Sequence, residues 1–167
     1  MDIFKYPDPV LAKVAKEVEK VSDIEALIRP MFELMYQSLG VGLAAPQVGL
    51  SKRFFVYNPS WDRHPGGDEI VVINPQILEY TGQKLTDVEG CLSVPELQAM
   101  IVRYSEIEVA YTTIEDNRVQ VHLSGLPARI FQHEFDHLDG RLLIDRMDPL
   151  ERQANVHLLK KLEGRFA

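Results

Sequence analysis

The sequence has very little cysteine: Cys91 is the single one among its 167 residues. A disulfide bond within the chain is therefore impossible. A lone cysteine is most often an inert buried thiol, but it can also be a nucleophile or a metal ligand. Composition alone favours the inert thiol, so any other role has to be argued from the rest of the sequence.

Long apolar runs and an excess of positive charge are also missing. No run of 18 apolar residues occurs, and residues 1–18 lack the basic, apolar and cleavage regions of a signal peptide, so we expect a cytoplasmic protein. The 18 Lys and Arg residues against 25 Asp and Glu residues give a formal net charge of −7 and a pI near 5.2. Such an acidic chain does not predict direct nucleic-acid readout or binding to an anionic membrane.

The residues that are present predict one domain over residues 1–167, because 46% of them are hydrophobic and a chain of this length can bury its own core. Helices are expected at about 22–40, 127–140 and 149–163. A loop rich in Pro and Gly is expected at 58–69. Short β-like runs, several of them alternating, predict strands at 53–57, 69–75, 76–82, 100–104, 107–113 and 118–124. Strands that cluster between helices, without regular alternation, indicate an α+β fold with antiparallel sheet.

Local signals give the expected ends of the helices. The stretch from Ser22 to Glu25 reads as a capping box, and Gly40 is a suitable C-terminal stop. Pro30 lacks a backbone donor, so a kink or a break is expected there. In the last helix the spacing of the apolar residues predicts that Val156, Leu159 and Leu162 face the core.

The clearest chemical pattern is "FQHEFDHLDG" at residues 131–140. His133 and His137 stand at i and i+4 on one face of a predicted helix, so both rings can reach one metal ion. Glu134 lies beside them without ligating. This H-E-x-x-H pattern is typical of metal-dependent hydrolases.

Two histidines need a third ligand. In the extended motif of one metalloprotease class that position would fall on Leu143, which cannot ligate. Glu163 is a carboxylate within reach of the chain, on the short last helix. Cys91, in "EGCLSVP", would make a site of one thiolate and two imidazoles with an open position for water, which catalysis requires.

Three motifs in this order resemble those of the peptide deformylase family: "GVGLAAPQ" (40–47), "EGCLS" (89–93) and "QHEFDH" (132–137). The resemblance extends over nearly the whole chain. It implies removal of the formyl group from the N-terminal methionine of nascent polypeptides, with release of formate. It also implies antiparallel sheets packed around a central helix that carries H-E-x-x-H, with an N-terminal and a C-terminal helix.

The resemblance implies a role for each motif residue. Cys91, His133 and His137 would bind Fe²⁺, for which Zn²⁺, Ni²⁺ or Co²⁺ could substitute; ligand types alone would leave zinc or iron. Glu134 would accept a proton from the attacking water and later deliver it to the departing amine.

Further residues would stabilise the transition state and bind the peptide. The Gln47 side-chain amide and the Leu92 backbone N–H would donate to the oxyanion. Gln98 departs from the family, in which many members have an arginine or an aromatic residue at this position. The expected substrate-binding residues are Val41, Gly42, Gly90, Leu126 and Ile130.

Outside the ligand set, Glu89 is expected to pair with Arg103 and so to fix the loop that carries Cys91. The tail after residue 150 carries four basic and two acidic side chains, a net charge of +2. Some members of the family are thought to dock on the ribosome, and the C-terminal helix is the expected contact.

Three other hypotheses remain open at this point. The first is a zinc peptidase that uses Glu163 as its third ligand. The second is a binding module in which the metal only stabilises the fold. The third is a dinucleotide loop, because residues 40–45 fit G-x-G-x-x-A; a preceding helix instead of a strand, and Pro46 after the motif, argue against it.

Overall fold

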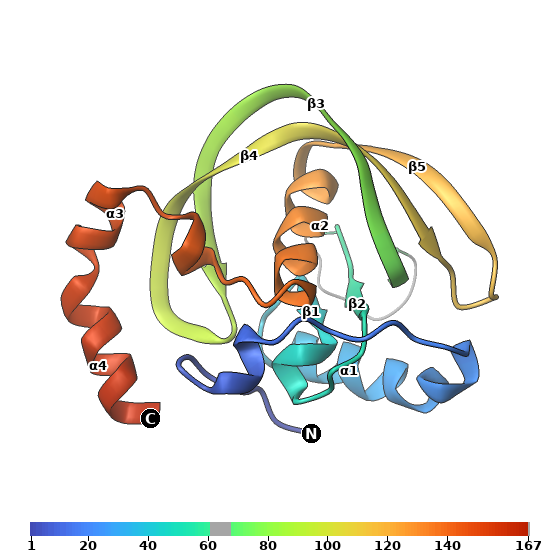
Figure 1. The fold of residues 1–167 in the computed structure, drawn as a ribbon, viewed down its shortest axis with the longest axis horizontal. Coiled ribbons are helices and arrows are strands. Elements are labelled where there is room, and N and C mark those ends of the chain that lie inside the picture. The colour runs from blue at the N-terminus through green and yellow to red at the C-terminus, as the bar shows by residue number, and fades with distance from the viewer. Residues whose placement is uncertain (61–67, 167) are drawn as a thin grey trace.

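The computed structural model describes residues 1–60 and 68–166, which form an α+β fold (Figure 1). Its antiparallel sheet has the strand order β1 to β5, so the predicted fold class is confirmed. The loop expected at 58–69 lies largely outside the described residues. The strands are β1 (Gly42–Ala44), β2 (Phe54–Tyr57), β3 (Ile70–Cys91), β4 (Val94–Thr112) and β5 (Arg118–Ser124). The helices are α1 (Glu25–Gln37), α2 (Gly125–Leu138), α3 (Pro149–Ala154) and α4 (Val156–Phe166), with 3-10 turns η1 (Pro9–Ala12), η2 (Val21–Asp23), η3 (Ala45–Val48) and η4 (Leu143–Arg146).

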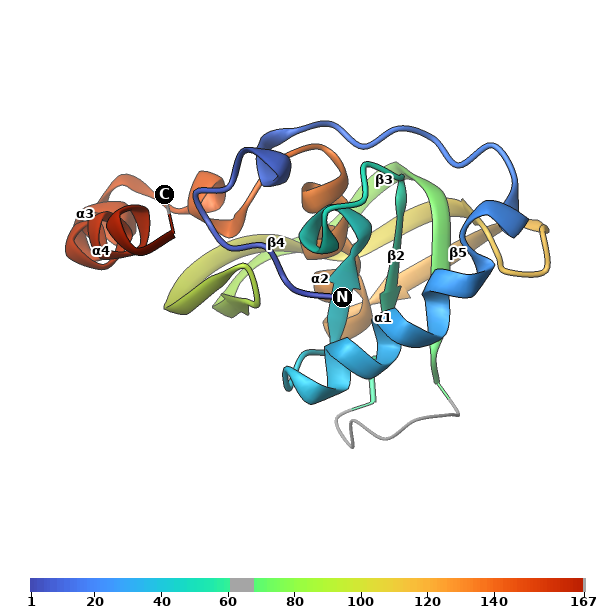
Figure 2. The same ribbon diagram turned by 90° about the horizontal axis from the view of Figure 1, so that it is seen from below.

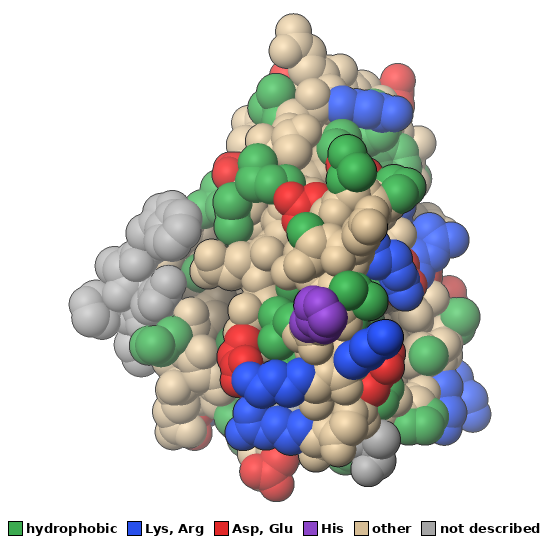
Figure 3. Space-filling model, turned by 90° about the vertical axis from the view of Figure 1, so that its left-hand side faces the viewer, with side chains coloured by type: hydrophobic (Ala, Val, Ile, Leu, Met, Phe, Trp, Pro, Cys, Tyr) green, Lys and Arg blue, Asp and Glu red, His purple; other side chains and the backbone are tan. Residues whose placement is uncertain are grey.

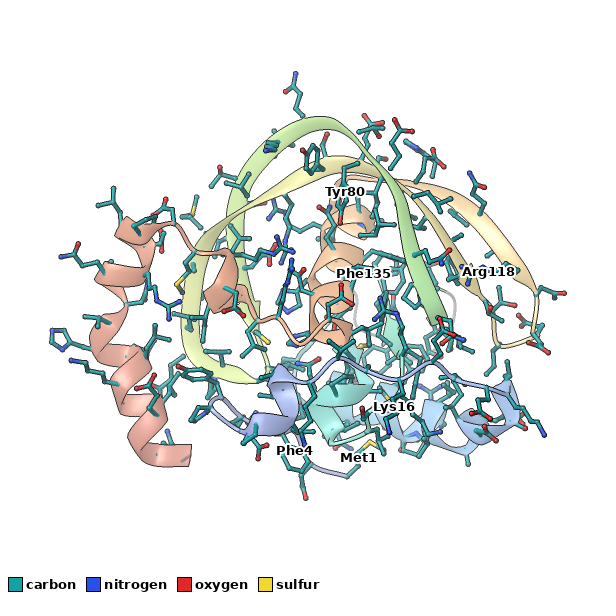
Figure 4. All side chains as sticks on the ribbon, in the orientation of Figure 1. Met1, Phe4, Lys16, Tyr80, Arg118 and Phe135 are labelled. Atoms are coloured by element: carbon teal, nitrogen blue, oxygen red, sulfur yellow. The ribbon has the colours of Figure 1, made fainter. Side chains whose placement is uncertain are left out.

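Helix α2 lies at the centre, beneath an arch formed by β3 and β4 (Figure 1). Its buried Phe131 meets Phe55 of β2 edge to face, with ring centroids 5.1 Å apart. Figure 4 labels Phe135 on the same helix, and its ring stacks on that of Phe131. Aromatic packing of this kind fixes the rotation of α2 about its own axis.

Strand β2 lies between α1 and α2. Successive side chains of a strand point to opposite faces, so those of β2 alternate between two apolar clusters, one on each side. Phe55 and Tyr57 pack with α2, whereas Phe54 and Val56 pack with α1. Figure 2 shows α1 from below, crossing the opposite side of this strand from α2. All four side chains are buried, which explains why "RFFVY" reads as a continuous apolar run.

Strands β3 and β4 are longer than the sequence predicts. The segments expected at 69–75 and 76–82 form one strand, and its register shifts between Ile73 and Gln76, where Asn74 adopts a φ of 48°. Residues 83–91 were not expected to be a strand, since polar side chains dominate there; they pair with residues 94–104 of β4. Strand pairing outweighs weak local propensity here, and it places Cys91 at the end of the β3–β4 hairpin.

The expected start of α1 is wrong. Ser22 belongs to η2, and Ile24, at the N-cap, makes no side-chain capping bond. The helix also continues through Pro30 without a break. Burial of the following Met31 and Phe32 against the sheet compensates for the missing backbone donor.

The end of α1 differs from the expected stop in one respect. The left-handed residue is Leu39, with φ 60°, and not Gly40. Gly40 instead donates its N–H to the Met35 carbonyl at 2.9 Å, the outer bond of a Schellman motif. This turn delivers the chain directly into β1.

The expected C-terminal helix is divided in two. Helix α3 ends at Ala154, Asn155 is its cap, and α4 begins at Val156. Leu159 and Leu162 are buried against the β3–β4 hairpin and η4, as expected, but Val156 is 37% exposed because it lies at the break between the helices.

We predict that Gly140→Ala destabilises the protein by at least about 2 kcal/mol in urea unfolding. Gly140 ends α2 with φ 68°, and a Cβ there would meet the Ala12 carbonyl oxygen at 2.6 Å. Gly125→Ala is the control for backbone strain alone, since it shares a positive φ but has open space, and should cost about 1 kcal/mol. Gly164→Ala, in α4, should be neutral or stabilising by up to about 1 kcal/mol. Equal effects of the three substitutions would contradict this.

Candidate active site

Cys91, His133 and His137 converge at the end of the β3–β4 hairpin. Their ligating atoms all lie within 4.8 Å of one another, and Cys91 Sγ is 3.3 Å from His137 Nε2. The helical i, i+4 spacing brings the two rings together, with centroids 5.1 Å apart. Glu163 is not in the cluster: its carboxylate accepts a hydrogen bond from the Tyr6 hydroxyl at 2.6 Å.

The donor set fits a divalent transition metal ion. One sulfur and two imidazole nitrogens are typical of such sites, and three protein ligands leave a position open. Nδ1 of His133 lies 3.0 Å from Glu89 Oε2, so the other ring nitrogen, Nε2, is left to bind a metal. Histidines that bind metals usually have the second ring nitrogen hydrogen-bonded to a carboxylate or a carbonyl group. Nδ1 of the buried His137 has no hydrogen-bond partner in the described part of the chain.

Glu134 is buried beside the cluster, with 4% of its surface exposed. Burial raises the pKa of its carboxyl group to about 7, although the charge of His133 opposes the shift. Its Oε2 has no hydrogen-bond partner among residues 1–60 and 68–166. A Cβ at Gly42 would overlap this carboxylate, so glycine is required where β1 passes it.

The Gln47 side chain is held in one orientation. Its Oε1 accepts the Ala44 N–H at 2.8 Å, and its Nε2 donates to Ser93 Oγ at 3.1 Å. The same Nε2 lies 3.7 Å from Cys91 Sγ. The amide donor of Gln47 therefore points toward the metal-ligand cluster. The segment "GVGLAAPQ" that contains it forms β1 and η3, not the strand, loop and helix of a dinucleotide site.

A cavity of about 610 Å³ opens beside these groups. His133, Glu134 and Gln98 form part of its wall. Val41 and Gly42 come from the chain at β1, and Gly90 comes from the end of β3. The residues expected to bind substrate all line it: Val41, Gly42, Gly90, Leu126 and Ile130.

Buried ion pairs connect the hairpin to α2. Arg103 of β4 donates to both oxygens of Glu89 at 2.9 and 3.0 Å, and to Asp136 at 2.5 Å. Arg129 also donates to Glu89, at 2.9 Å, and Arg146 donates to both oxygens of Asp136. Burial by itself would raise the pKa of Glu89, but the hydrogen bonds from His133 and Arg103 hold this pKa well below its usual range.

Sequence reasoning missed several of these groups. For Asp136 the sequence left two interpretations open, a residue that orients a neighbour and a surface aspartate; it is 5% exposed and lies between two guanidinium groups. Arg129 stands one turn before His133 on α2, a spacing that could have placed it near Glu89. Ser93 lies in the "EGCLS" motif without an expected role, and it is the partner that holds the Gln47 amide.

Comparison with known proteins identifies the family. A model of the family described as polypeptide deformylase matches residues 1–153. The chain belongs to the polypeptide deformylase family. The resemblance inferred from the three motifs is thus confirmed.

Individual deformylases are similar over most of the chain. A peptide deformylase of Thermotoga neapolitana is 47% identical over 148 residues, 88% of this chain and 87% of that protein. The chloroplastic/mitochondrial peptide deformylase 1B of Arabidopsis thaliana is 43% identical over 99% of this chain, which spans 61% of the plant protein's length. A crystal structure of peptide deformylase from Plasmodium falciparum superimposes with a TM-score of 0.95 at 38% identity, covering 99% of this chain and 96% of that one.

We predict that Arg103→Met costs about 3 to 5 kcal/mol of unfolding free energy, because it leaves the carboxylates of Glu89 and Asp136 buried beside an apolar side chain. Lys161→Met removes a partner of Glu96 at an exposed ion pair and is the matched control, with a far smaller expected loss. Urea unfolding of both variants and the parent measures the difference. Similar losses in the two variants would contradict a structural role for the buried network.

Proposed function

We propose that this protein hydrolyses the formyl group from the N-terminal formylmethionine of nascent polypeptides and releases formate. The observation that carries the proposal is the convergence of Cys91, His133 and His137 beside the buried carboxylate of Glu134, next to a cavity of about 610 Å³. Membership of the deformylase family supports the same reaction.

We infer that Cys91, His133 and His137 hold one divalent ion. Fe²⁺ is the metal we propose, and Zn²⁺, Ni²⁺ or Co²⁺ would be able to replace it. When bound, such an ion supplies a Lewis acid that polarises a carbonyl group and lowers the pKa of a water molecule. Glu89 would fix the ring of His133 through its hydrogen bond to Nδ1.

Glu134 is the proposed general base and acid. A carboxyl group with a pKa of about 7 is divided between its two protonation states near neutrality, so it can take a proton from water and return it to the leaving amine. Its burial keeps bulk water from competing for that proton. The unpartnered Oε2 leaves a lone pair available for this transfer.

Gln47 and Leu92 are proposed to stabilise the negative charge that develops on the formyl oxygen. The Gln47 amide is already oriented by Ala44 and Ser93, so little reorganisation is needed during the reaction. The Leu92 N–H follows directly after Cys91 in the chain. Two fixed donors beside the reacting carbonyl are the usual means of stabilising a tetrahedral intermediate.

The peptide itself is proposed to lie between two pieces of main chain. Val41 and Gly42 would pair with one edge of an extended substrate, and Gly90 with the other. The methionine side chain would enter the apolar part of the cavity beside Leu126 and Ile130. Glycine at two of these positions lets the backbones approach closely.

The chain is proposed to act as one domain in the compartment where formylated chains are made. We expect the cytoplasm, although the similar plant proteins are named as chloroplastic or mitochondrial. No helix in the described ranges is long and apolar enough to cross a bilayer. Ribosome docking through α3 and α4 is supported by the net charge of that segment; Figure 3 shows basic and acidic side chains together with a histidine on this face of the molecule.

We predict that anaerobically prepared protein loaded with Fe²⁺ releases formate from formyl-Met-Ala-Ser, and acts far more slowly on the formyl-Leu analogue, because the branched side chain fits a site for methionine poorly. Formate is measured against the same protein freed of metal, and metal content is determined on the same sample. Absence of formate above this control would overturn the proposed function.

Substitutions distinguish the deformylase from a peptidase that uses Glu163. Cys91→Ser should lose most of the bound metal, whereas Glu163→Ala should keep it, because Glu163 pairs with Tyr6 away from the cluster. Glu134→Gln should retain the metal and lower kcat by about 10² to 10⁴-fold. Metal retained in Cys91→Ser and lost in Glu163→Ala would reverse the assignment of the third ligand.

A further inference from the structure

The N-terminal segment is attached to both walls of the site by three consecutive residues. The Phe4 N–H donates to the Gln47 carbonyl at 2.8 Å, and the Tyr6 N–H donates to the Ser93 carbonyl at 2.8 Å. Between them, the Lys5 ammonium donates to the Leu92 carbonyl at 2.6 Å. Figure 4 labels Phe4 on this segment, which runs past η3.

Lys5 makes the one side-chain bond of the three. The backbone bonds of Phe4 and Tyr6 could be made by almost any residue, whereas the bond to Leu92 requires a long side chain with a donor at its end. A charged donor forms a shorter and stronger hydrogen bond than a neutral one. The side chain is partly buried; burial lowers the pKa of Lys5, and the nearby Cys91 thiolate opposes that shift.

The turn that Lys5 contacts is held at Ser93 by Tyr6 and Gln47, and at the Leu92 carbonyl by Lys5. Cys91 pairs with Val94, so Leu92 and Ser93 form the two-residue end of the hairpin, where the ladder has no further cross-strand bonds. This turn carries a proposed metal ligand on one side of Leu92 and the partner of the Gln47 amide on the other. A small rotation of either peptide plane would move both groups.

We propose that Lys5 is a positioning residue for this turn. By holding the Leu92 carbonyl, the Lys5 ammonium orients the Leu92–Ser93 peptide plane. Through the Leu92 backbone dihedrals it also limits rotation of the adjoining Cys91–Leu92 plane, so that the Leu92 N–H faces the reacting carbonyl and Cys91 Sγ keeps its place among the ligands. The part that concerns the reacting carbonyl rests on the proposed deformylase function. The part that concerns Cys91 does not.

The test compares Lys5→Met, which keeps the length of the side chain without a donor, with Lys5→Arg, which restores a charged donor. Lys13→Met, at an exposed lysine of the same N-terminal region, is the control. Formate release by the metal-loaded proteins should give a kcat lowered about tenfold in Lys5→Met with KM within about twofold of the parent, because the substrate-binding residues are unchanged. Lys5→Arg should recover most of the loss, and Lys13→Met should match the parent.

A second readout does not depend on substrate. Absorption spectra of the Co²⁺-substituted proteins report the environment of the Cys91 thiolate, and the thiolate-to-cobalt band should change in Lys5→Met but not in Lys13→Met. A kcat unchanged in Lys5→Met, a loss confined to KM or to the unfolding free energy, an equal loss in Lys5→Arg, or identical cobalt spectra would each overturn the proposal. If the parent itself released no formate, the proposed function would fail while the spectra still tested the position of Cys91.

Discussion

The structure depends most on the bidentate ion pair between Glu89 and Arg103. Both side chains are buried, and their charges would be unfavourable there without complete hydrogen bonding. Two residues of α2 complete this hydrogen bonding: Asp136 accepts from Arg103, and the Nδ1 atom of His133 bonds to Glu89. One interaction therefore holds together two strands that are joined by a two-residue turn and the helix that lies under their arch. A hairpin placed by hydrophobic contact alone could shift along α2, whereas a guanidinium group with fixed donor directions permits very little displacement.

This constraint determines the shape of the site. Cys91 lies two residues beyond Glu89 on the same strand, so the anchor of the hairpin is also the anchor of the thiolate. The far wall comes from β1, which passes so close to α2 that only glycine fits at position 42. The cavity is lined by residues of both walls, among them Gly42 and Gly90. The same carboxylate that pairs with Arg103 also orients His133, so the position and the electrostatics of the site have a common origin.

The parts of this arrangement that could be predicted from the sequence are those encoded locally. Helical spacing and the stop at Gly140 identified α2, a continuous apolar run identified β2, and alternation identified β5. Each of these patterns lies within a single element and does not depend on a distant partner. The lengths of β3 and β4 could not be predicted, since residues 83–91 are polar and become a strand only through their partner. The ion pairs that Asp136 makes with Arg103 and Arg146 could not be predicted either. Nothing in the sequence indicates which charged residue of a helix will be enclosed by a distant hairpin. For the site, the ordered motifs indicated the proposed ligands and the proposed general base, whereas the contact of Lys5 requires the three-dimensional structure.

The end of α2 explains why the third candidate ligand is a cysteine from another segment of the chain. One turn before His133, α2 carries Arg129, whose guanidinium group is not a metal ligand; beyond His137, Gly140 adopts a left-handed conformation and the chain turns away. The next candidate position, Leu143, is buried in the apolar cluster beneath the C-terminal helix. The helix can thus supply two ligands and no more, and the third has to come from a separate segment held rigidly against it. The β3–β4 hairpin meets this requirement because the ion pairs of Arg103 with Asp136 and of Glu89 with Arg129 hold it against α2. A site built on two elements that are fixed to each other beforehand needs little rearrangement to bind its ion.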